Sequence, residues 1–243
     1  MAATGTLVSA AHAEEVDADV GGGAAALMAV VNYQNYDLAD LLDGNDIHEL
    51  SATFPRVVMG KNGGEFRKQV LRQDAFNVRV TAASATIKGN RRGTPYAEAT
   101  TTLASVVVRN GPLASTKLGT IETYCRWDLD GSRGSTTLID ANGQKTQPAP
   151  NTVSEIPGLG TITFNEQYIE TFYLKDASGN YIPDGNGWFL TAEVLYVVGA
   201  HIELNAPLLG GNLATDLYLG FTSCDPVKLP PLSGLTAIST PSD

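Results

Sequence analysis

The stretch Phe76-Asn77-Val78-Arg79-Val80-Thr81-Ala82 alternates apolar and polar residues. Such a period of two sends every second side chain to one face of a strand, so we expect Phe76, Val78, Val80 and Ala82 to face a core. Later segments are rich in Thr, Val, Ile, Tyr and Phe, which suit a pleated and half-buried surface; they cover residues 100–109, 117–129, 135–139, 161–174, 188–198 and 213–221. The sequence predicts an all-β fold, an antiparallel β-sandwich or a jelly-roll-like arrangement.

Turn signals separate these segments. Asn142-Gly143 is typical of a type I′ hairpin turn, because Asn and Gly both tolerate positive φ, and Asp184-Gly185-Asn186-Gly187 predicts a second turn. The pattern differs before residue 60. There Gly21-Gly22-Gly23 breaks the chain, and the segment 37–43, which stops at Gly44, is compatible with a short helix.

The chain length favours one domain. Sandwiches often reach 243 residues without dividing, so we assign a single β-sandwich domain to residues 14–225. Residues 1–13 join a short apolar stretch to Ala11-His12-Ala13, which has the form of a signal-peptide cleavage site, but no Lys or Arg precedes Arg56. We interpret them as a signal remnant or an N-terminal arm. Residues 226–243 are interpreted as a C-terminal tail, and the protein as extracellular or displayed at the cell surface.

The charge balance excludes some partners. The formal net charge is -10 and the isoelectric point is near 4.7, whereas a nucleic-acid-binding protein needs a basic stripe for counterion release. Lys88 with Arg91-Arg92 is the only basic cluster, and it is more simply a solvated loop tip. No stretch approaches the roughly 18 apolar residues of a membrane span. We therefore expect neither a nucleic-acid partner nor a transmembrane segment.

Cys125 and Cys224 are the only cysteines, and strand-like segments lie between them. In a chain with an export signature, such a pair favours a disulfide, which would stabilise the fold by up to about 4.7 kcal/mol on the chain-entropy model. The alternative is two unrelated buried thiols, since free cysteine is commonly buried. Neither residue lies in a C-x-x-C arrangement, so thiol-redox catalysis and metal ligation are not indicated.

No catalytic motif is present. The histidines are His12, His48 and His201, and the sequence contains neither G-x-S-x-G nor H-E-x-x-H. Glu166 and Glu170 lie on one face of a predicted strand without any acid–base asymmetry, and a structural motif explains them more simply. We expect the protein not to be an enzyme, because no acid, base and nucleophile converge.

Two acidic turns supply oxygen atoms of the kind that calcium prefers. Asp128-Leu129-Asp130-Gly131-Ser132 begins like a calcium loop but lacks the later ligands, and the loop 176–186 has unspecific spacing. Asp, Asn and Ser are also common in turns because their side chains bond to nearby backbone. We expect no cofactor and no metal ligands, with calcium as the alternative.

One part of the chain resembles a known family. Residues 150–167, which contain Pro150-Asn151-Thr152 and Asn165-Glu166-Gln167, are similar to the most recognisable stretch of the actinobacterial choice-of-anchor P family. The resemblance covers about residues 100–225 and includes the positions of Cys125 and Cys224. It implies a secreted or surface-displayed protein without enzymatic activity. The insertion Tyr173 to Trp188 departs from the family pattern, and residues 14–95 match only weakly.

Two functions fit these observations. The first is a structural surface protein that assembles with copies of itself into a fibre or coat, by donating a strand from a terminal arm to a neighbour's sheet edge. The second is a binding module for a glycan or a host surface, with Tyr173, Tyr181 and Trp188 as contact residues. The alternative for Trp188 is a structural role, in which its side chain fills the sandwich core.

Overall fold

The computed structural model describes residues 19–31, 56–58, 64–75, 78–90, 94–110, 114–156, 160–175, 178–204 and 214–227. In these ranges the chain forms twelve β-strands and no helix, arranged in two antiparallel sheets. The β-sandwich predicted from the sequence is therefore confirmed. The segment 37–43, the arm 1–13 and the tail beyond Val227 lie outside the described residues.

Sheet I is a meander in which each strand pairs with the next in the sequence. Its strands are β3 (Gly64–Ala75), β4 (Val78–Asn90), β5 (Tyr96–Asn110), β6 (Ala114–Asp128), β7 (Gly131–Ile139) and β8 (Lys145–Thr146). The turn from β7 to β8 contains Asn142-Gly143. Only Gly143 has a positive φ there, so the turn is not the predicted type I′ turn.

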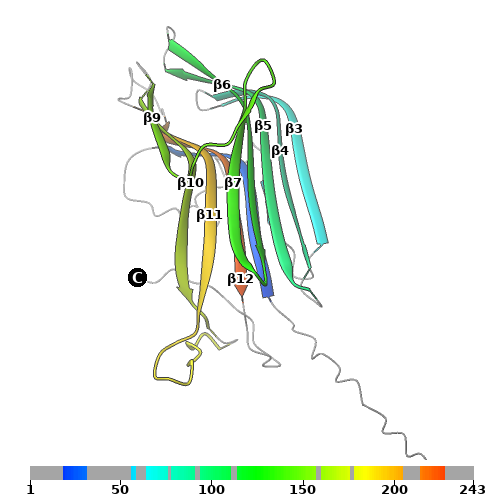
Figure 1. Cartoon of the computed structure of the whole chain (residues 1–243), viewed down its shortest axis with the longest axis vertical. Coiled ribbons are helices and arrows are strands. Elements are labelled where there is room, and N and C mark those ends of the chain that lie inside the picture. Colours follow the sequence, from blue (N-terminus) through cyan, green and yellow to red (C-terminus); the bar gives the residue numbers. More distant parts are fainter. Residues whose placement is uncertain are drawn as a thin grey trace, which may run out of the picture.

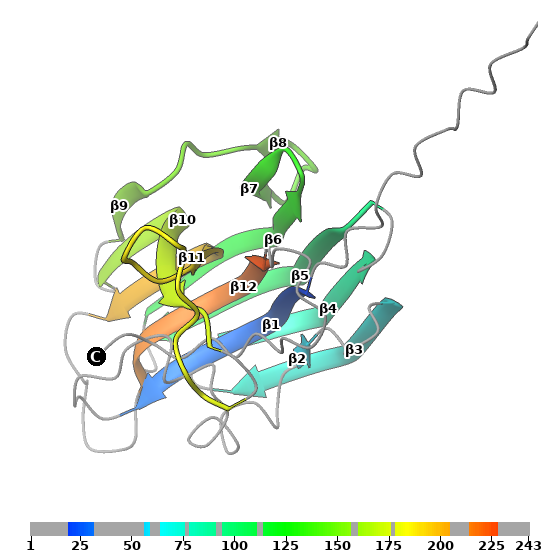
Figure 2. The same ribbon diagram turned by 90° about the horizontal axis from the view of Figure 1, so that it is seen from below.

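Sheet II has the strand order β2-β1-β12-β11-β10-β9, which makes the first and last long strands neighbours. Its strands are β1 (Asp19–Val31), β2 (Arg56–Val58), β9 (Thr152–Ile156), β10 (Gly160–Tyr173), β11 (Thr191–Leu204) and β12 (Ala214–Val227). The two sheets pack face to face, with β1 over β4 and β5, and β12 over β5 and β6 (Figures 1 and 2).

The core lies between the sheets. It includes Val78 and Val80, as the alternation predicts, together with Leu103, Ile121, Ile162, Ala200, Ile202, Leu217 and Leu219. Ala82 is only half-buried, and Ala83 is the residue that joins this core. The change of face falls where the pairing of β4 with β5 is interrupted, between the pairs Arg79–Val107 and Ala82–Ala104. The prediction that Ala82 shares the face of Val78 and Val80 is wrong.

Cys125 on β6 and Cys224 on β12 form a disulfide that joins the two sheets. Their Cα atoms lie 6.0 Å apart, within the usual bridging range. Both residues are fully buried, in a cluster that includes Trp127, Leu195 and Val197. The alternative of two unrelated thiols is thus wrong, and the bond fastens one sheet to the other.

The outer faces of the two sheets differ. In β11 the consecutive residues Leu195, Tyr196, Val197 and Val198 are all at most 5% exposed, so both faces of this strand are buried. The outer face of sheet I instead carries ion pairs between neighbouring strands. Among the described residues, sheet I thus has the polar outer face that is usual for a two-layer sandwich, whereas β11 of sheet II is buried on both sides.

Candidate functional site

An exposed aromatic patch lies on the connection between β10 and β11. This connection extends beyond the ends of the two strands (Figure 1, yellow). We call it the aromatic tip. Its exposed aromatic residues are Tyr173, Tyr181, Trp188 and Phe189, with exposed fractions of 38%, 44%, 74% and 47%. Large aromatic side chains seldom lie so open together unless the surface is used for binding.

A short repeat in the sequence builds this tip. Tyr173-Leu174, Tyr181-Ile182 and Phe189-Leu190 follow one another at a spacing of eight residues, each an aromatic residue followed by an aliphatic one. The aliphatic members pack together with Ala192 into a small core of their own. Because neighbouring residues of an extended chain point to opposite sides, burying the aliphatic member turns the aromatic one outward.

Backbone hydrogen bonds fix the three repeats side by side. The Ile182 N–H donates to the Leu174 carbonyl at 3.0 Å, the Leu190 N–H to the Ile182 carbonyl at 2.8 Å, and the Leu174 N–H to the Leu190 carbonyl at 2.9 Å. These three bonds form a closed triangle. The aromatic residues are therefore displayed on an ordered base rather than on an irregular loop.

The turn before Trp188 is held by Asp184. One carboxylate oxygen of Asp184 accepts hydrogen bonds from the Asn186 N–H at 2.7 Å and the Trp188 N–H at 3.1 Å. The Asp184 N–H donates to the Trp188 carbonyl at 2.9 Å. The turn predicted at residues 184–187 is confirmed, and its acidic side chain serves the local backbone.

Three of the aromatic rings contact one another. Tyr181 and Phe189 have ring centroids 5.3 Å apart, while Tyr173 meets Tyr181 at 5.8 Å and Phe189 at 6.3 Å, both edge to face. The Lys175 ammonium lies 4.6 Å from the centroid of the Tyr181 ring. Aromatic contacts of this kind stiffen the base of the tip.

The structure places all three predicted contact residues, Tyr173, Tyr181 and Trp188, on this tip. Tyr173 and Tyr181 touch each other, and Trp188 is exposed on the same connection. The alternative that Trp188 fills the core is wrong, since its side chain is exposed to solvent and Trp127 is the tryptophan in the core. Phe189 and Lys175 were missed, although the eight-residue spacing of aromatic residues would have revealed Phe189.

The polar stretch Asn165-Glu166-Gln167 has a structural role. Asn165 has a positive φ and donates from its side chain to the Pro148 carbonyl at 2.9 Å. Gln167 donates to the Asn165 side-chain oxygen at 2.9 Å and to the Gly134 carbonyl on β7 at 3.1 Å. Asn151 accepts from the Gln167 N–H at 2.8 Å. These amides tie β10 of sheet II to β7 of sheet I.

Glu166 points to the other face of β10, toward a histidine. His201 on β11 has its Nδ1 atom 3.0 Å from the Glu166 carboxylate, and its ring is stacked on Tyr218 at 4.2 Å. On the same face Tyr168 is stacked on Tyr196, and burial raises the pKa of the Tyr168 phenol above its usual value. His12 and His48 lie outside the described residues.

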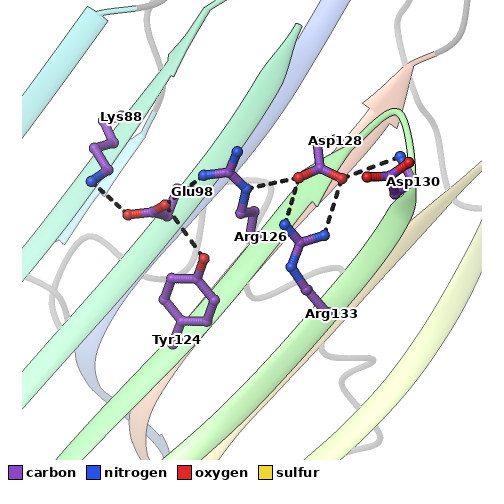
Figure 3. A network of polar contacts seen from close by, with 7 residues as sticks. All are labelled: Lys88, Glu98, Tyr124, Arg126, Asp128, Asp130 and Arg133. Atoms are coloured by element: carbon purple, nitrogen blue, oxygen red, sulfur yellow. Dashed lines mark hydrogen bonds and ion pairs between the residues drawn. The ribbon is translucent and has the colours of Figure 1, made fainter.

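A row of ion pairs crosses the outer face of sheet I (Figure 3). Glu98 on β5 lies 2.7 Å from Lys88 and 3.0 Å from Arg126, and Arg126 lies 2.8 Å from Asp128. Arg133 on β7 contacts both oxygens of Asp128. Hydrogen bonds from two arginines hold the pKa of the Asp128 carboxyl well below its usual value, with the larger effect from Arg133 and the smaller from Arg126. The row links β4, β5, β6 and β7.

Replacing Asp128 with asparagine is expected to lower the free energy of unfolding at neutral pH by about 1 kcal/mol, the upper end for pairs at a surface. The pKa of a free aspartate is about 3.9, and the folded value is lower. The stabilisation is therefore complete above about pH 5 and is lost as pH falls through the folded pKa.

Urea unfolding of both proteins at several pH values from 7 downward tests this pH dependence. The difference in the free energy of unfolding between wild type and Asp128→Asn should become smaller below about pH 4. Asp130→Asn in the same turn is the control, because its exposed carboxylate makes none of these ion pairs. If this difference does not depend on pH, the negative charge of Asp128 is not the source of its stabilising effect.

In the two acidic turns, the carboxylates of Asp128 and Asp184 are engaged by donors of the protein itself. The Asp128 carboxylate is occupied by Arg126, Arg133 and the Asp130 N–H, and Asp184 serves its own turn. Over the described ranges, no three His, Cys, Asp or Glu side chains gather as metal ligands would. In the same ranges no helix has the length and hydropathy to cross a membrane.

Comparison of the chain with protein-family models, curated proteins and solved structures found no match. The likeness of residues 100–225 to the choice-of-anchor P family therefore stays a prediction. A fold alone does not determine a function, so the exposed aromatic tip is the feature from which a function can be inferred.

Proposed function

We propose that this protein is a non-enzymatic extracellular binding module that uses the aromatic tip to hold a glycan. The supporting observation is the exposure of Tyr173, Tyr181, Trp188 and Phe189 on one ordered connection. Sugar rings present apolar C–H faces that pack on aromatic rings, while their hydroxyls need polar neighbours. Ser178, Asn180 and Asn186 are exposed polar residues of the same connection.

The test is binding of the labelled wild-type protein to an immobilised glycan panel. We expect retention of at least one glycan class, and a loss of at least about tenfold in affinity in the triple variant Tyr173→Ala/Tyr181→Ala/Trp188→Ala. Circular dichroism of the variant checks that the sandwich still folds, which is expected because these side chains lie outside its core.

A matched control removes an exposed aromatic ring elsewhere. Phe66 on β3 is 42% exposed and lies in sheet I, away from the tip, so Phe66→Ala should bind like the wild type. If no glycan on the panel is retained, or if the triple variant binds as well as the wild type, the proposal is wrong.

Self-assembly into a fibre or coat is the second candidate, and one feature favours it. Strand β3 is twelve residues long and, within the described residues, pairs only with β4, so one of its edges has unpaired backbone groups. We rank this role second because Arg67, Lys68 and an irregularity at Arg72 are features that discourage edge pairing. A protein that sediments as a monomer at high concentration would exclude it.

A further inference from the structure

We propose that Trp188 alone offers an open aromatic face on the tip, so that the site holds one pyranose ring of a soluble oligosaccharide or a chain end. The flat face of a packed polysaccharide would not fit. This inference rests on the proposed function and narrows its ligand class. It is argued from the orientation of the rings and from the groups around Trp188.

The other three rings are engaged with one another. Tyr173 turns its ring at 77° to Tyr181 and at 86° to Phe189, and the ring planes of Tyr181 and Phe189 meet at 42°. Lys175 also lies over the Tyr181 ring. A ring that packs edge to face against its neighbours has less of its face left for a sugar.

Trp188 differs from these three rings. At 74% it is the most exposed aromatic side chain among the described residues, and none of the ring contacts within them involves it. Its backbone is nevertheless fixed by the bonds to Asp184. Because the backbone is already held, stacking of this open ring on a ligand has to order the side chain but not the turn.

The ring orientations also bear on the form of the ligand. A packed polysaccharide exposes many sugar rings in one plane, and a surface that binds it needs several coplanar aromatic rings. Angles of 42°, 77° and 86° exclude a coplanar platform made from Tyr173, Tyr181 and Phe189. One open ring instead matches one sugar ring.

The surroundings of Trp188 favour a neutral sugar over a lipid surface. The turn before it is Asp184-Gly185-Asn186-Gly187, and a Cβ built on either glycine meets nothing within 4 Å, so a ligand has room there. No Lys or Arg occurs between residues 176 and 190, and the chain carries a net charge of -10. An anionic membrane would be repelled rather than attracted.

The experiment uses ¹⁹F NMR of the full chain labelled with 5-fluorotryptophan. The protein has two tryptophans, so Trp188 gives one signal and the buried Trp127 gives an internal reference. Soluble cello-, chito-, xylo- and manno-oligosaccharides are titrated, and retention on microcrystalline cellulose and on chitin is measured in parallel. Vesicles of phosphatidylglycerol are the lipid probe.

We expect an oligosaccharide to shift the Trp188 signal alone, with no retention on either solid. Trp188→Ala should lose at least about tenfold in affinity, and Trp188→Phe should recover part of it because a smaller ring still stacks. Phe66→Ala, which removes an exposed ring on β3 outside the tip, should bind within about threefold of the wild type.

The remaining outcomes separate the two proposals. Retention on cellulose or chitin without any shift by soluble sugars would overturn the single-ring inference and leave glycan binding standing. So would oligosaccharide binding that is unchanged in Trp188→Ala. A Trp188 signal that responds only to vesicles, or to none of the probes while the glycan panel is also negative, would overturn both.

Discussion

Replacing both Cys125 and Cys224 with alanine is expected to lower the free energy of unfolding by about 4 kcal/mol. The bond joins residues 99 positions apart, and the chain-entropy model gives about 4.7 kcal/mol for a loop of 100 residues. Alanine is chosen because both sites are fully buried, and a serine hydroxyl there would add its own cost. A loss of this size should lower Tm by roughly 10–15 °C in a chain of this length.

Guanidinium unfolding of the wild type, the double variant and the reduced wild type measures this effect. The reduced wild type should unfold close to the double variant, and reductant should not affect the double variant. Val197→Ala is the control, because Val197 packs in the cluster around the bond and its truncation leaves a cavity there. This variant should lower the free energy of unfolding by about 2 kcal/mol, with or without reductant. A double variant as stable as the wild type would contradict a role for the bond in stability.

Gly119→Ala is expected to destabilise the fold by at least about 3 kcal/mol, through a clash added to backbone strain. Gly119 lies on β6 with φ +77°, a conformation that residues with a Cβ rarely adopt. A Cβ built there would lie 2.2 Å from the carbonyl oxygen of Ile139, which is backbone at the end of β7 and cannot turn aside. Substitution must therefore separate β6 from β7 at this point.

Gly143→Ala is the matched control for Gly119→Ala. Its φ is +80°, almost the same as that of Gly119, but a Cβ there would meet nothing within 4 Å. It should therefore show only the conformational part of the cost, about 1 kcal/mol. Thermal unfolding of both variants measures the difference. Equal losses at the two positions would mean that β7 yields to the added methyl group.

Strands with one buried face could be predicted from the sequence, and strands without such a contrast could not. In β4 the alternation of Val78, Arg79 and Val80 reflects one buried and one exposed face. In β1 the consecutive Ala24, Ala25 and Ala26 are all buried, so the sequence shows a continuous apolar run instead of a period of two. Residues 64–69 of β3 are all exposed, so neither face of the strand is buried there and the sequence again shows no alternation with a period of two.

The candidate site could be predicted only in part. The composition of the hairpin pointed to Tyr173, Tyr181 and Trp188, but composition does not say which ring turns outward. That depends on Leu174, Ile182 and Leu190, whose packing on one another decides the outward side. The role of Asn165 and Gln167 in joining the sheets depends on the Gly134 and Pro148 carbonyls, which lie far from them in the sequence.

The closed triangle of bonds in the aromatic tip also limits how many repeats the tip can hold. The bonds run from Ile182 to Leu174, from Leu190 to Ile182 and from Leu174 to Leu190, so each repeat uses both of the others. A duplicated unit 181–188 would bring two further rings, Tyr181 and Trp188, but it could enter only by opening one of these three bonds. The tip is therefore a closed set of three repeats, whose reach is fixed by the same bonds that hold its rings in place.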